Sequence, residues 1–286
     1  MSANQPARRA IGQVKEVTSL ANPIVKDIRA LALKKARDEQ GAFVAEGLKL
    51  VIEALDLGWT IRTFVFAKSR RGDPAVGKLA ARTVAAGGLV LEATEKVLAA
   101  ITRRDNPQVA LGVFEQRLMQ VGQIRPTAGD VWVALDRVRD PGNLGTVVRT
   151  IDAVGARGLI LIGESTDPFS MEAVRASMGS IFAVPVAKAS AEQFLAWRKT
   201  FAGLVVGTHL AGAVDYRDVA YGERATLLVM GNEQQGLSEA LAQACDSLVR
   251  IPQAGRADSL NLAVATAVVL YEVRRGALRL EPEAKP

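Results

Sequence analysis

The fold of this chain is constrained most by four short apolar runs in its second half, at residues 131–135, 159–162, 204–208 and 226–230. Each run has the length of a buried strand, and helical stretches such as residues 144–154 separate them. Parallel strands that are joined by helices are buried on both faces and therefore have continuous apolar sequences. The pattern predicts an α/β domain whose mostly parallel sheet is covered by helices on both faces. General rules of topology would make this sheet doubly wound and unknotted.

The first part of the chain has the pattern of a smaller α/β unit. Helices are expected at residues 24–39, 48–57, 75–86 and 95–101, and extended segments at residues 42–45, 61–67, 89–92 and 109–114. The following stretch contains Pro126 and Gly129, which are typical of a connection between domains. We therefore expect a small domain at residues 15–116, a linker at residues 117–130 and a second domain at residues 131–280.

Charge is distributed unevenly between these parts. Residues 1–125 hold 20 Lys and Arg against 12 Asp and Glu, a net charge of +8. Residues 126–286 hold 16 against 18, a net charge of −2. Because basic surfaces attract polyanions, the anion-binding surface is expected mainly in the first part.

Cysteine and hydropathy indicate the compartment. Cys245 is the single cysteine, which excludes an intramolecular disulfide and a metal site built from cysteines. The chain has no unbroken apolar run of about 18 residues, and its start lacks an apolar stretch of signal-peptide length. These features favour a cytoplasmic protein that does not cross a membrane.

The loop after the first apolar run is the first candidate for chemistry, because open α/β sheets bind ligands at the carboxyl ends of their strands. Asn143 is expected to cap the next helix, and the apolar stripe of that helix leaves Arg149 in line with Gly145. Helical side chains lean toward the N-terminus, so the guanidinium of Arg149 is expected to reach back to the loop. The alternative is an ordinary solvated arginine.

The second candidate is the segment MGNEQQGLS at residues 230–238, which follows another apolar run. Gly231 is expected to let the backbone approach a ligand closely, and Glu233 offers a carboxylate at the same place. A simple turn, with Asn232 or Ser238 as a cap, is the alternative.

The third candidate is the segment IPQAGRADSLNLAVA at residues 251–265. Asp258 or Ser259 is expected to cap a helix that is apolar nearly all round and therefore buried, in a core or between subunits. Asn261, in the first turn, is either a buried amide that finds partners in an active site or a second capping residue at the surface.

Other catalytic patterns are missing from the sequence. There is no Gly-x-Gly-x-x-Gly, no Gly-Lys-Ser or Gly-Lys-Thr, and no His-Glu-x-x-His, which weakens nicotinamide, ATP and zinc-hydrolase interpretations. The lone histidine, His209, has no second candidate to form a triad and is expected to be structural.

The three candidate segments, in this order, closely resemble the signature motifs of the SpoU (TrmH-like) branch of the SPOUT methyltransferases. The resemblance spans about residues 131–276 and is carried by Asn143 with Arg149, by Gly231-Asn232-Glu233 and by Ser259-Leu260-Asn261. The first part, with Asn22-Pro23 and Ala45-Glu46-Gly47, is similar to the ribosomal-protein-like RNA-binding domain of rRNA-modifying members. Small departures are Gln234, Gln253 and Ala263, where glycine, methionine and serine are common.

This resemblance implies a function and a site. The second domain would be tied in a deep trefoil knot, bind S-adenosylmethionine there, and form a homodimer. The reaction would be methylation of a ribose 2′-hydroxyl of RNA, with rRNA favoured and no metal required. Catalytic roles would fall to Arg149, Asn143, Glu233, Ser259 and Asn261, and donor binding to Thr208, Gly231, Ile251 and Leu260.

Three alternatives stand beside this hypothesis. The same reaction on tRNA is the nearest, although the separate basic domain favours rRNA. An inactive RNA-binding protein that kept the knot is the second, against which the retained Arg149, Glu233, Ser259 and Asn261 argue. A nicotinamide-dependent dehydrogenase on a doubly wound sheet is the third, and the chain lacks its glycine fingerprint.

Overall fold

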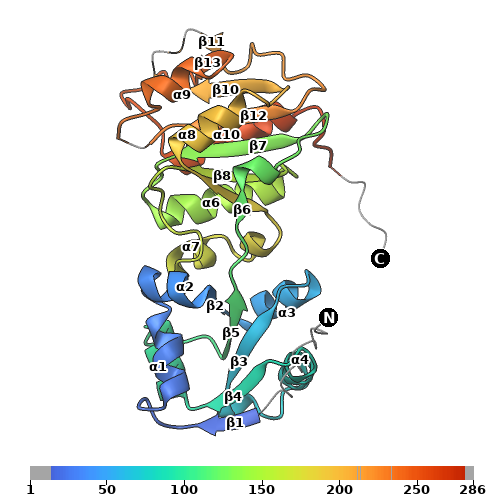
Figure 1. Cartoon of the computed structure of the whole chain (residues 1–286), viewed down its shortest axis with the longest axis vertical. Coiled ribbons are helices and arrows are strands. Elements are labelled where there is room, and N and C mark those ends of the chain that lie inside the picture. Colours follow the sequence, from blue (N-terminus) through green and yellow to red (C-terminus); the bar gives the residue numbers. More distant parts are fainter. Residues whose placement is uncertain (1–13, 211, 213, 233, 281–286) are drawn as a thin grey trace, which may run out of the picture. The chain divides into compact units, whose positions relative to one another are not determined.

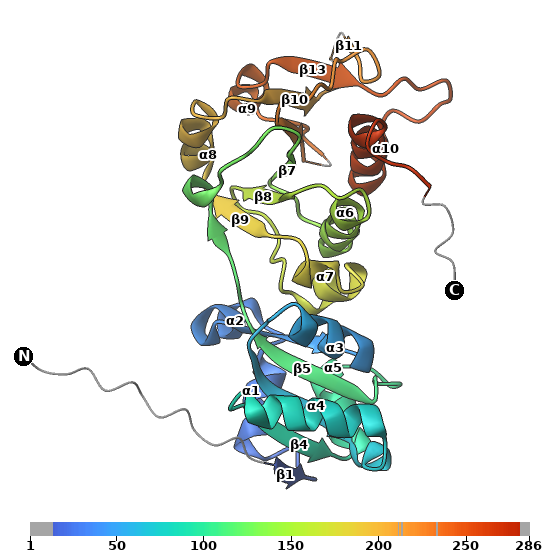
Figure 2. The ribbon, with the colours of Figure 1, turned by 90° about the vertical axis from the view of Figure 1, so that its right-hand side faces the viewer.

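The computed structural model describes residues 14–280, except residues 211, 213 and 233. The described chain divides into two compact units (Figures 1 and 2). The first unit extends to Gln116 and includes Phe169–Arg175, and the second consists of Arg117–Pro168 and the chain from Ala176 onward.

The first unit is built on a mixed sheet in the order β1-β4-β3-β5-β2. β5 runs antiparallel to β3 and β2, and the other pairings are parallel. The elements are β1 (Val14–Val17), α1 (Pro23–Ala30), α2 (Lys34–Gln40), β2 (Ala42–Glu46), α3 (Leu48–Asp56), β3 (Ile61–Ala67), η1 (Lys68–Arg70), α4 (Pro74–Ala85), β4 (Leu89–Ala93), α5 (Glu95–Thr102) and β5 (Ala110–Glu115).

The helix that was expected over residues 24–39 is two helices. Asn22 caps α1 by accepting a hydrogen bond from the Ile24 amide at 2.9 Å, and Pro23 begins the helix. The chain turns at Leu31, and α2 then ends at Gly41, whose φ is 58°. The sequence of α2, KKARDEQ, contains one apolar residue, Ala36, so apolar periodicity could not locate the break.

The second unit contains an eight-stranded sheet in the order β11-β13-β10-β12-β7-β8-β9-β6, and all its pairings are parallel. Its elements are β6 (Met119–Gln120), η2 (Val121–Gln123), β7 (Val131–Asp136), α6 (Pro141–Ala153), β8 (Gly158–Ile162), η3 (Ser180–Phe182), β9 (Val186–Ala189), α8 (Ala191–Arg198), β10 (Leu204–Thr208), β11 (Val214–Asp215), β12 (Thr226–Met230), α9 (Glu239–Gln243), β13 (Ser247–Arg250) and α10 (Leu262–Arg274). Helix α7 (Met171–Ala176) comes before η3 in the chain and belongs, except for its last residue, to the first unit.

Helices cover this sheet on both faces. α8 and α9 lie on one side of the sheet, and α6 and α10 pack against each other on the opposite side (Figure 2). Side chains of β7 alternate accordingly: Trp132 and Ala134 join the cluster that contains Phe194 and Trp197 of α8. The predicted α/β architecture with a parallel sheet is therefore confirmed. The trefoil knot stays a prediction, because strand order does not say which segment passes through which loop.

The segment 117–130, which was expected to be a linker, contributes to the second unit. β6 within it pairs with β9, and Val121 and Ile124 are buried in the same cluster as the sheet residues. Deleting the chain up to residue 125 would therefore remove part of the core of the second unit.

Candidate functional site

A cavity of about 390 Å³ lies in the second unit at the carboxyl ends of β10, β12 and β13. Thr208 is the last residue of β10, Gly231 directly follows β12 and Ile251 directly follows β13. Leu260, shortly before α10, completes this set. All the residues that the family resemblance implies for donor binding therefore line one cavity, at the strand ends where α/β sheets bind ligands.

Gly231 is required by the loop itself. A Cβ atom at this position would lie 2.3 Å from the carbonyl carbon of Gly236 and from the amide nitrogen of Leu237. The returning backbone of its own loop therefore requires glycine at this position, and the approach of a ligand to Gly231 stays a prediction. Gly236 has a φ of +65°, which also favours glycine.

Asn232 holds the same loop together. Its side chain is buried, and Oδ1 accepts hydrogen bonds from the amides of Gln234 at 2.9 Å and Gln235 at 3.3 Å. Its Nδ2 donates to the carbonyl of Arg137 at 2.8 Å. Asn232 therefore stabilises a turn, as the simpler interpretation of this motif held. Glu233, the expected carboxylate, lies outside the described residues.

The start of α6 differs from the expectation. Asp140 is its cap and accepts a hydrogen bond from the Asn143 amide at 2.5 Å, and Pro141 begins the helix. The prediction that Asn143 is the cap was wrong, because an aspartate followed by proline three residues earlier satisfies the free amides. Because Asp140 caps the helix, the side chain of Asn143 can form hydrogen bonds with other partners.

Asn261 meets Asn143 although they are 118 residues apart in the chain. The Asn261 Nδ2 donates to Asn143 Oδ1 at 2.9 Å. The Asn261 Oδ1 caps α10 by accepting from the amides of Ala263 at 2.9 Å and Val264 at 3.3 Å. The cap is therefore Asn261, not Asp258 or Ser259, and its amide is exposed. This agrees with the alternative interpretation of Asn261 as a capping residue at the surface.

α10 is buried on one face and exposed on the other. Leu262 and Val269 are buried, whereas Val264 is 50% and Tyr271 is 53% exposed. The prediction of a helix buried all round does not hold within this single chain, since the apolar residues on the outer face have no cover there. Ser259 and Leu260 at its start are also exposed and line the cavity.

Arg149 is exposed on α6, and none of the hydrogen bonds and ion pairs among the described residues involves its side chain. Gly145, one turn earlier, is buried. The reach of the guanidinium toward the loop at the start of α6 stays a prediction.

Two adjacent residues at the end of β7, which sequence reasoning did not single out, organise the neighbouring loops. Asp136 is 3% exposed and accepts from Arg137 Nε at 3.0 Å and Nη2 at 2.9 Å. This hydrogen-bonded pairing raises the pKa of Arg137. An acidic residue that closes an otherwise apolar strand, VWVALD, was the available signal.

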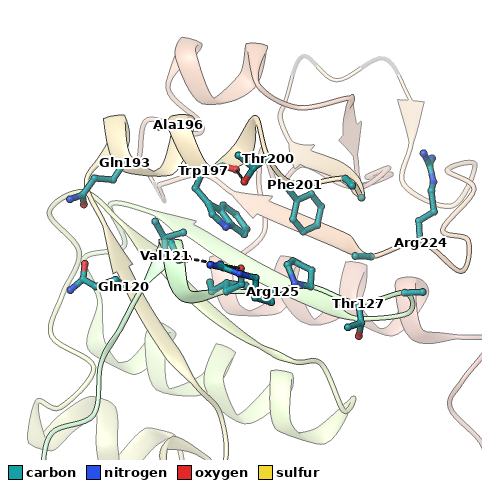
Figure 3. A pocket seen from close by; sticks show the side chains of 17 residues that line it. Gln120, Val121, Arg125, Thr127, Gln193, Ala196, Trp197, Thr200, Phe201 and Arg224 are labelled. Carbon is teal, nitrogen blue, oxygen red and sulfur yellow. Dashed lines mark hydrogen bonds between the residues drawn. The ribbon is translucent and has the colours of Figure 1, made fainter.

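A larger cavity, of about 1030 Å³, lies at the opposite ends of the strands (Figure 3). Ala128, Gly203 and Ala225 line it shortly before β7, β10 and β12 begin, beside Trp197 and Phe201. None of the predicted site residues lines it, whereas the smaller cavity also includes His209. Volume is therefore a poor guide here, and we place the candidate site at the smaller cavity.

Neither a metal cluster nor a membrane span is found in the described chain. Residues 14–280, apart from the three gaps, contain no group of three or more His, Cys, Asp or Glu side chains arranged to hold a metal ion. Within the same residues, no helix is both long and apolar enough to cross a bilayer.

Comparisons with known proteins match both parts of the chain. Residues 130–271 match the SpoU rRNA Methylase family, and residues 22–112 match the MRM3-like substrate binding domain. A 23S rRNA (uridine(2479)-2′-O)-methyltransferase of Streptomyces viridochromogenes is 32% identical over 86% of this chain and 86% of its own length. The 23S rRNA (guanosine(2553)-2′-O)-methyltransferase RlmP of Bacillus subtilis is 30% identical over 91% of this chain and all of its own length.

Solved structures agree with these matches. An AdoMet-bound rRNA methyltransferase from Sinorhizobium meliloti is 61% identical, with a TM-score of 0.88 over 93% of this chain and 99% of that chain. The SpoU methyltransferase AviRb from Streptomyces viridochromogenes, in complex with the cofactor AdoMet, is 30% identical, with a TM-score of 0.79 over 90% of this chain and 98% of that chain. The chain therefore belongs to the SpoU rRNA methylase family.

Proposed function

We propose that this protein transfers a methyl group from S-adenosylmethionine to a ribose 2′-hydroxyl of 23S-type rRNA in the cytoplasm. The observation that carries the proposal is the cavity at the carboxyl ends of β10, β12 and β13, with the Asn143–Asn261 hydrogen bond on the segment that leads into α10. The named relatives that match nearly the whole chain act on 23S rRNA ribose.

The cavity suits the methyl donor in size and chemistry. Its volume of about 390 Å³ falls within the range of about 300 to 1,000 Å³ that is common for small-molecule sites. Ile251 and Leu260 offer apolar surface for a purine, and Thr208 and Ser259 offer hydroxyls for polar groups. When bound, S-adenosylmethionine supplies a methyl group on a positively charged sulfur.

Arg149 is the proposed clamp for the RNA. A guanidinium stays protonated at neutral pH, so it is poorly suited to remove a proton but well suited to hold a phosphate through two parallel hydrogen bonds. We infer that Arg149 binds the phosphate next to the target ribose and orients the 2′-hydroxyl. The hydroxyl proton then passes to that phosphate or to water.

The amide pair and the flanking loops position the reactants. Asn143 carries a donor and an acceptor for the hydroxyl, whereas Asn261, whose Oδ1 caps α10, is proposed to hold Asn143 in place through its Nδ2. Ser259 and Glu233 are proposed to position the ribose and the loops around it. No step of this reaction needs a metal ion, since alignment and stabilisation of the developing oxyanion come from hydrogen-bond donors.

The first unit is proposed to bind the RNA through its basic surface. Residues 1–116 hold 18 Lys and Arg against 12 Asp and Glu, a net charge of +6, and neutralising backbone phosphates is the dominant source of affinity for nucleic acids. A dedicated RNA-binding unit at residues 15–116, before the methyltransferase unit at residues 131–280, supports rRNA over tRNA as the substrate.

A homodimer through the second unit completes the proposal. The exposed face of α10 presents Val264 and Tyr271, which a second copy of the chain would cover. Sedimentation velocity on the wild type and on Val264→Glu tests this part, because a charge in a dimer contact shifts the protein toward monomer. A monomeric wild type would contradict it.

Methyl transfer can be measured directly. Purified protein is incubated with labelled S-adenosylmethionine and with rRNA or tRNA from cells that lack the gene, and the modified ribose is mapped. We expect incorporation into 23S rRNA and none into tRNA. Incorporation into tRNA alone would favour the tRNA alternative, and donor binding without any transfer would favour the inactive RNA-binding protein.

A further inference from the structure

Three hydrogen bonds join the end of β7 to residues 231–232 and 234–238, which we call the β12 loop. The Asn232 Nδ2 donates to the Arg137 carbonyl at 2.8 Å, and the Ser238 amide donates to Asp136 Oδ2 at 3.3 Å. Between them, Arg137 Nη1 donates to Gln235 Oε1 at 2.9 Å. Gln235 also lines the cavity proposed for the methyl donor.

The Arg137 side chain is held firmly enough to act as a support. Its guanidinium forms two hydrogen bonds to the buried Asp136 carboxylate, which leaves Nη1 directed at Gln235. A Cβ atom built on Gly163 would lie only 3.2 Å from the Arg137 Cγ, so glycine there leaves room for the arginine stem. The aliphatic part of the Arg137 side chain thus packs against Gly163, and its guanidinium is paired with Asp136.

The backbone at Arg137 is also unusual. Its φ is +50°, a left-handed conformation that residues other than glycine adopt rarely, and few described residues besides glycine share it. Such conformations persist where surrounding contacts over-determine them. Here the contacts are the Asp136 pair, the Gln235 amide and the Asn232 hydrogen bond to the Arg137 carbonyl.

We propose that Arg137 is a positioning residue for methyl transfer, which holds the β12 loop in its binding conformation through Gln235. This proposal rests on the proposed function, since it assigns the supporting contact for the cavity that would hold the donor. The same residue lies between β7 and the loop that begins α6, where Asn143 and Arg149 reside. Arg137 thereby couples the segment that carries the RNA-directed residues to the loop that lines the donor cavity.

Guanidinium geometry makes the contact specific to arginine. A lysine at this position would keep a positive charge beside Asp136. Its single ammonium nitrogen cannot replace the separate N–H groups that donate to the Asp136 carboxylate and to Gln235 at the same time. We therefore use Arg137→Lys rather than alanine, which would leave the buried Asp136 carboxylate unpaired and endanger folding. Gln235→Ala removes only the loop side of the contact.

The experiment is a double-mutant cycle on the full-length protein with two readouts. Amide hydrogen exchange of peptides from residues 231–238, in the absence of donor, reports the loop directly. In both Gln235→Ala and Arg137→Lys, we expect the amide hydrogens of these peptides to exchange at least about threefold faster than in the wild type. Gln235→Glu should restore protection because a carboxylate accepts from Arg137, and Gln234→Ala, whose side chain makes no described contact with Arg137, should leave exchange unchanged.

Calorimetry with S-adenosylmethionine supplies the second readout. Each single variant should raise the dissociation constant for S-adenosylmethionine about threefold to tenfold. The double variant should bind the donor as tightly as the weaker-binding single variant, because both substitutions remove the same contact. Additive losses in the double variant, or unchanged loop exchange in Gln235→Ala, would overturn the proposal. Failure of the wild type to bind donor would instead refute the proposed function, and the exchange readout does not depend on it.

Discussion

The two roles of Asn261 can be separated by substitution. Its Oδ1 caps α10 through the amides of Ala263 and Val264, and its Nδ2 bridges to Asn143. Asn261→Ala removes both interactions. Asn261→Ser keeps an efficient cap, because serine and asparagine are comparable at this position, but its hydroxyl lacks the amide that spans to Asn143.

The magnitudes follow from these contacts. Losing the cap costs about 1 kcal/mol of stability, and an exposed neutral hydrogen bond adds at most about 1 kcal/mol. For a unit of this size, each kcal/mol corresponds to roughly 2–4 °C in the melting temperature. Losing the cap and the bridge together should therefore lower the melting temperature of Asn261→Ala by about 2 to 8 °C, and losing the bridge alone should lower that of Asn261→Ser by at most about 4 °C. Turnover should fall at least about fivefold in both, since about 1 kcal/mol of positioning is lost.

Thermal unfolding by calorimetry and steady-state methylation of rRNA are the assays. Asn143→Ala combined with Asn261→Ser should be no slower than Asn143→Ala alone, because both remove the same bridge. A wild-type kcat in Asn261→Ser would refute the role of the bridge. A wild-type melting temperature in Asn261→Ala would refute the role of the cap.

Three further predictions address the clamp, the RNA and the cysteine. Arg149→Ala should lower turnover more than about tenfold with little change in donor affinity. The control is Arg157→Ala, which changes another exposed arginine and should retain activity. Unchanged turnover in Arg149→Ala would show that Arg149 takes no part in the mechanism. Deleting residues 1–116, which spares β6, should weaken rRNA binding. The slope of log binding constant against log salt concentration should fall in magnitude by about 0.7 to 0.9 per lost phosphate contact, and donor binding by calorimetry shows that the remaining unit is folded. An unchanged slope would place the RNA site on the second unit. Burial raises the pKa of the Cys245 thiol to about 12, so at pH 8 the thiol stays protonated and alkylation by iodoacetamide should be more than about 100-fold slower in the native protein than in urea; equal rates would contradict this.

The sequence indicated the strands of the second unit well because each is a short apolar run. The runs at residues 204–208 and 226–230 coincide with β10 and β12. It missed β9 and β13, whose residues Lys188 and Arg250 interrupt the apolar pattern. It also missed β6, a strand of two residues that is too short to show any period.

Helix starts were the weaker part of the prediction. Several residues near the start of α6 and α10 are good caps, among them Asp140, Asn143, Ser259 and Asn261. At α6, Asp140 followed by Pro141 begins the helix three residues before Asn143, and at α10 the Asn261 side chain accepts from the amides of the first turn. The sequence therefore named the right segments, assigned the cap of α6 to the wrong residue, and offered the true cap of α10, Asn261, only as a second cap beside Asp258 or Ser259.

By itself, the sequence determined the α/β class, the placement of two polar loops after buried strands and of a third polar segment before an apolar helix, and the family to which their residues belong. All of these follow from local order along the chain. The tertiary structure alone decided which loops meet. Asn143 and Asn261 are joined across 118 residues, and Arg137 reaches Gln235 across 98. Such pairings depend on strand order and helix packing, which bring distant segments together, and no local propensity encodes that distance.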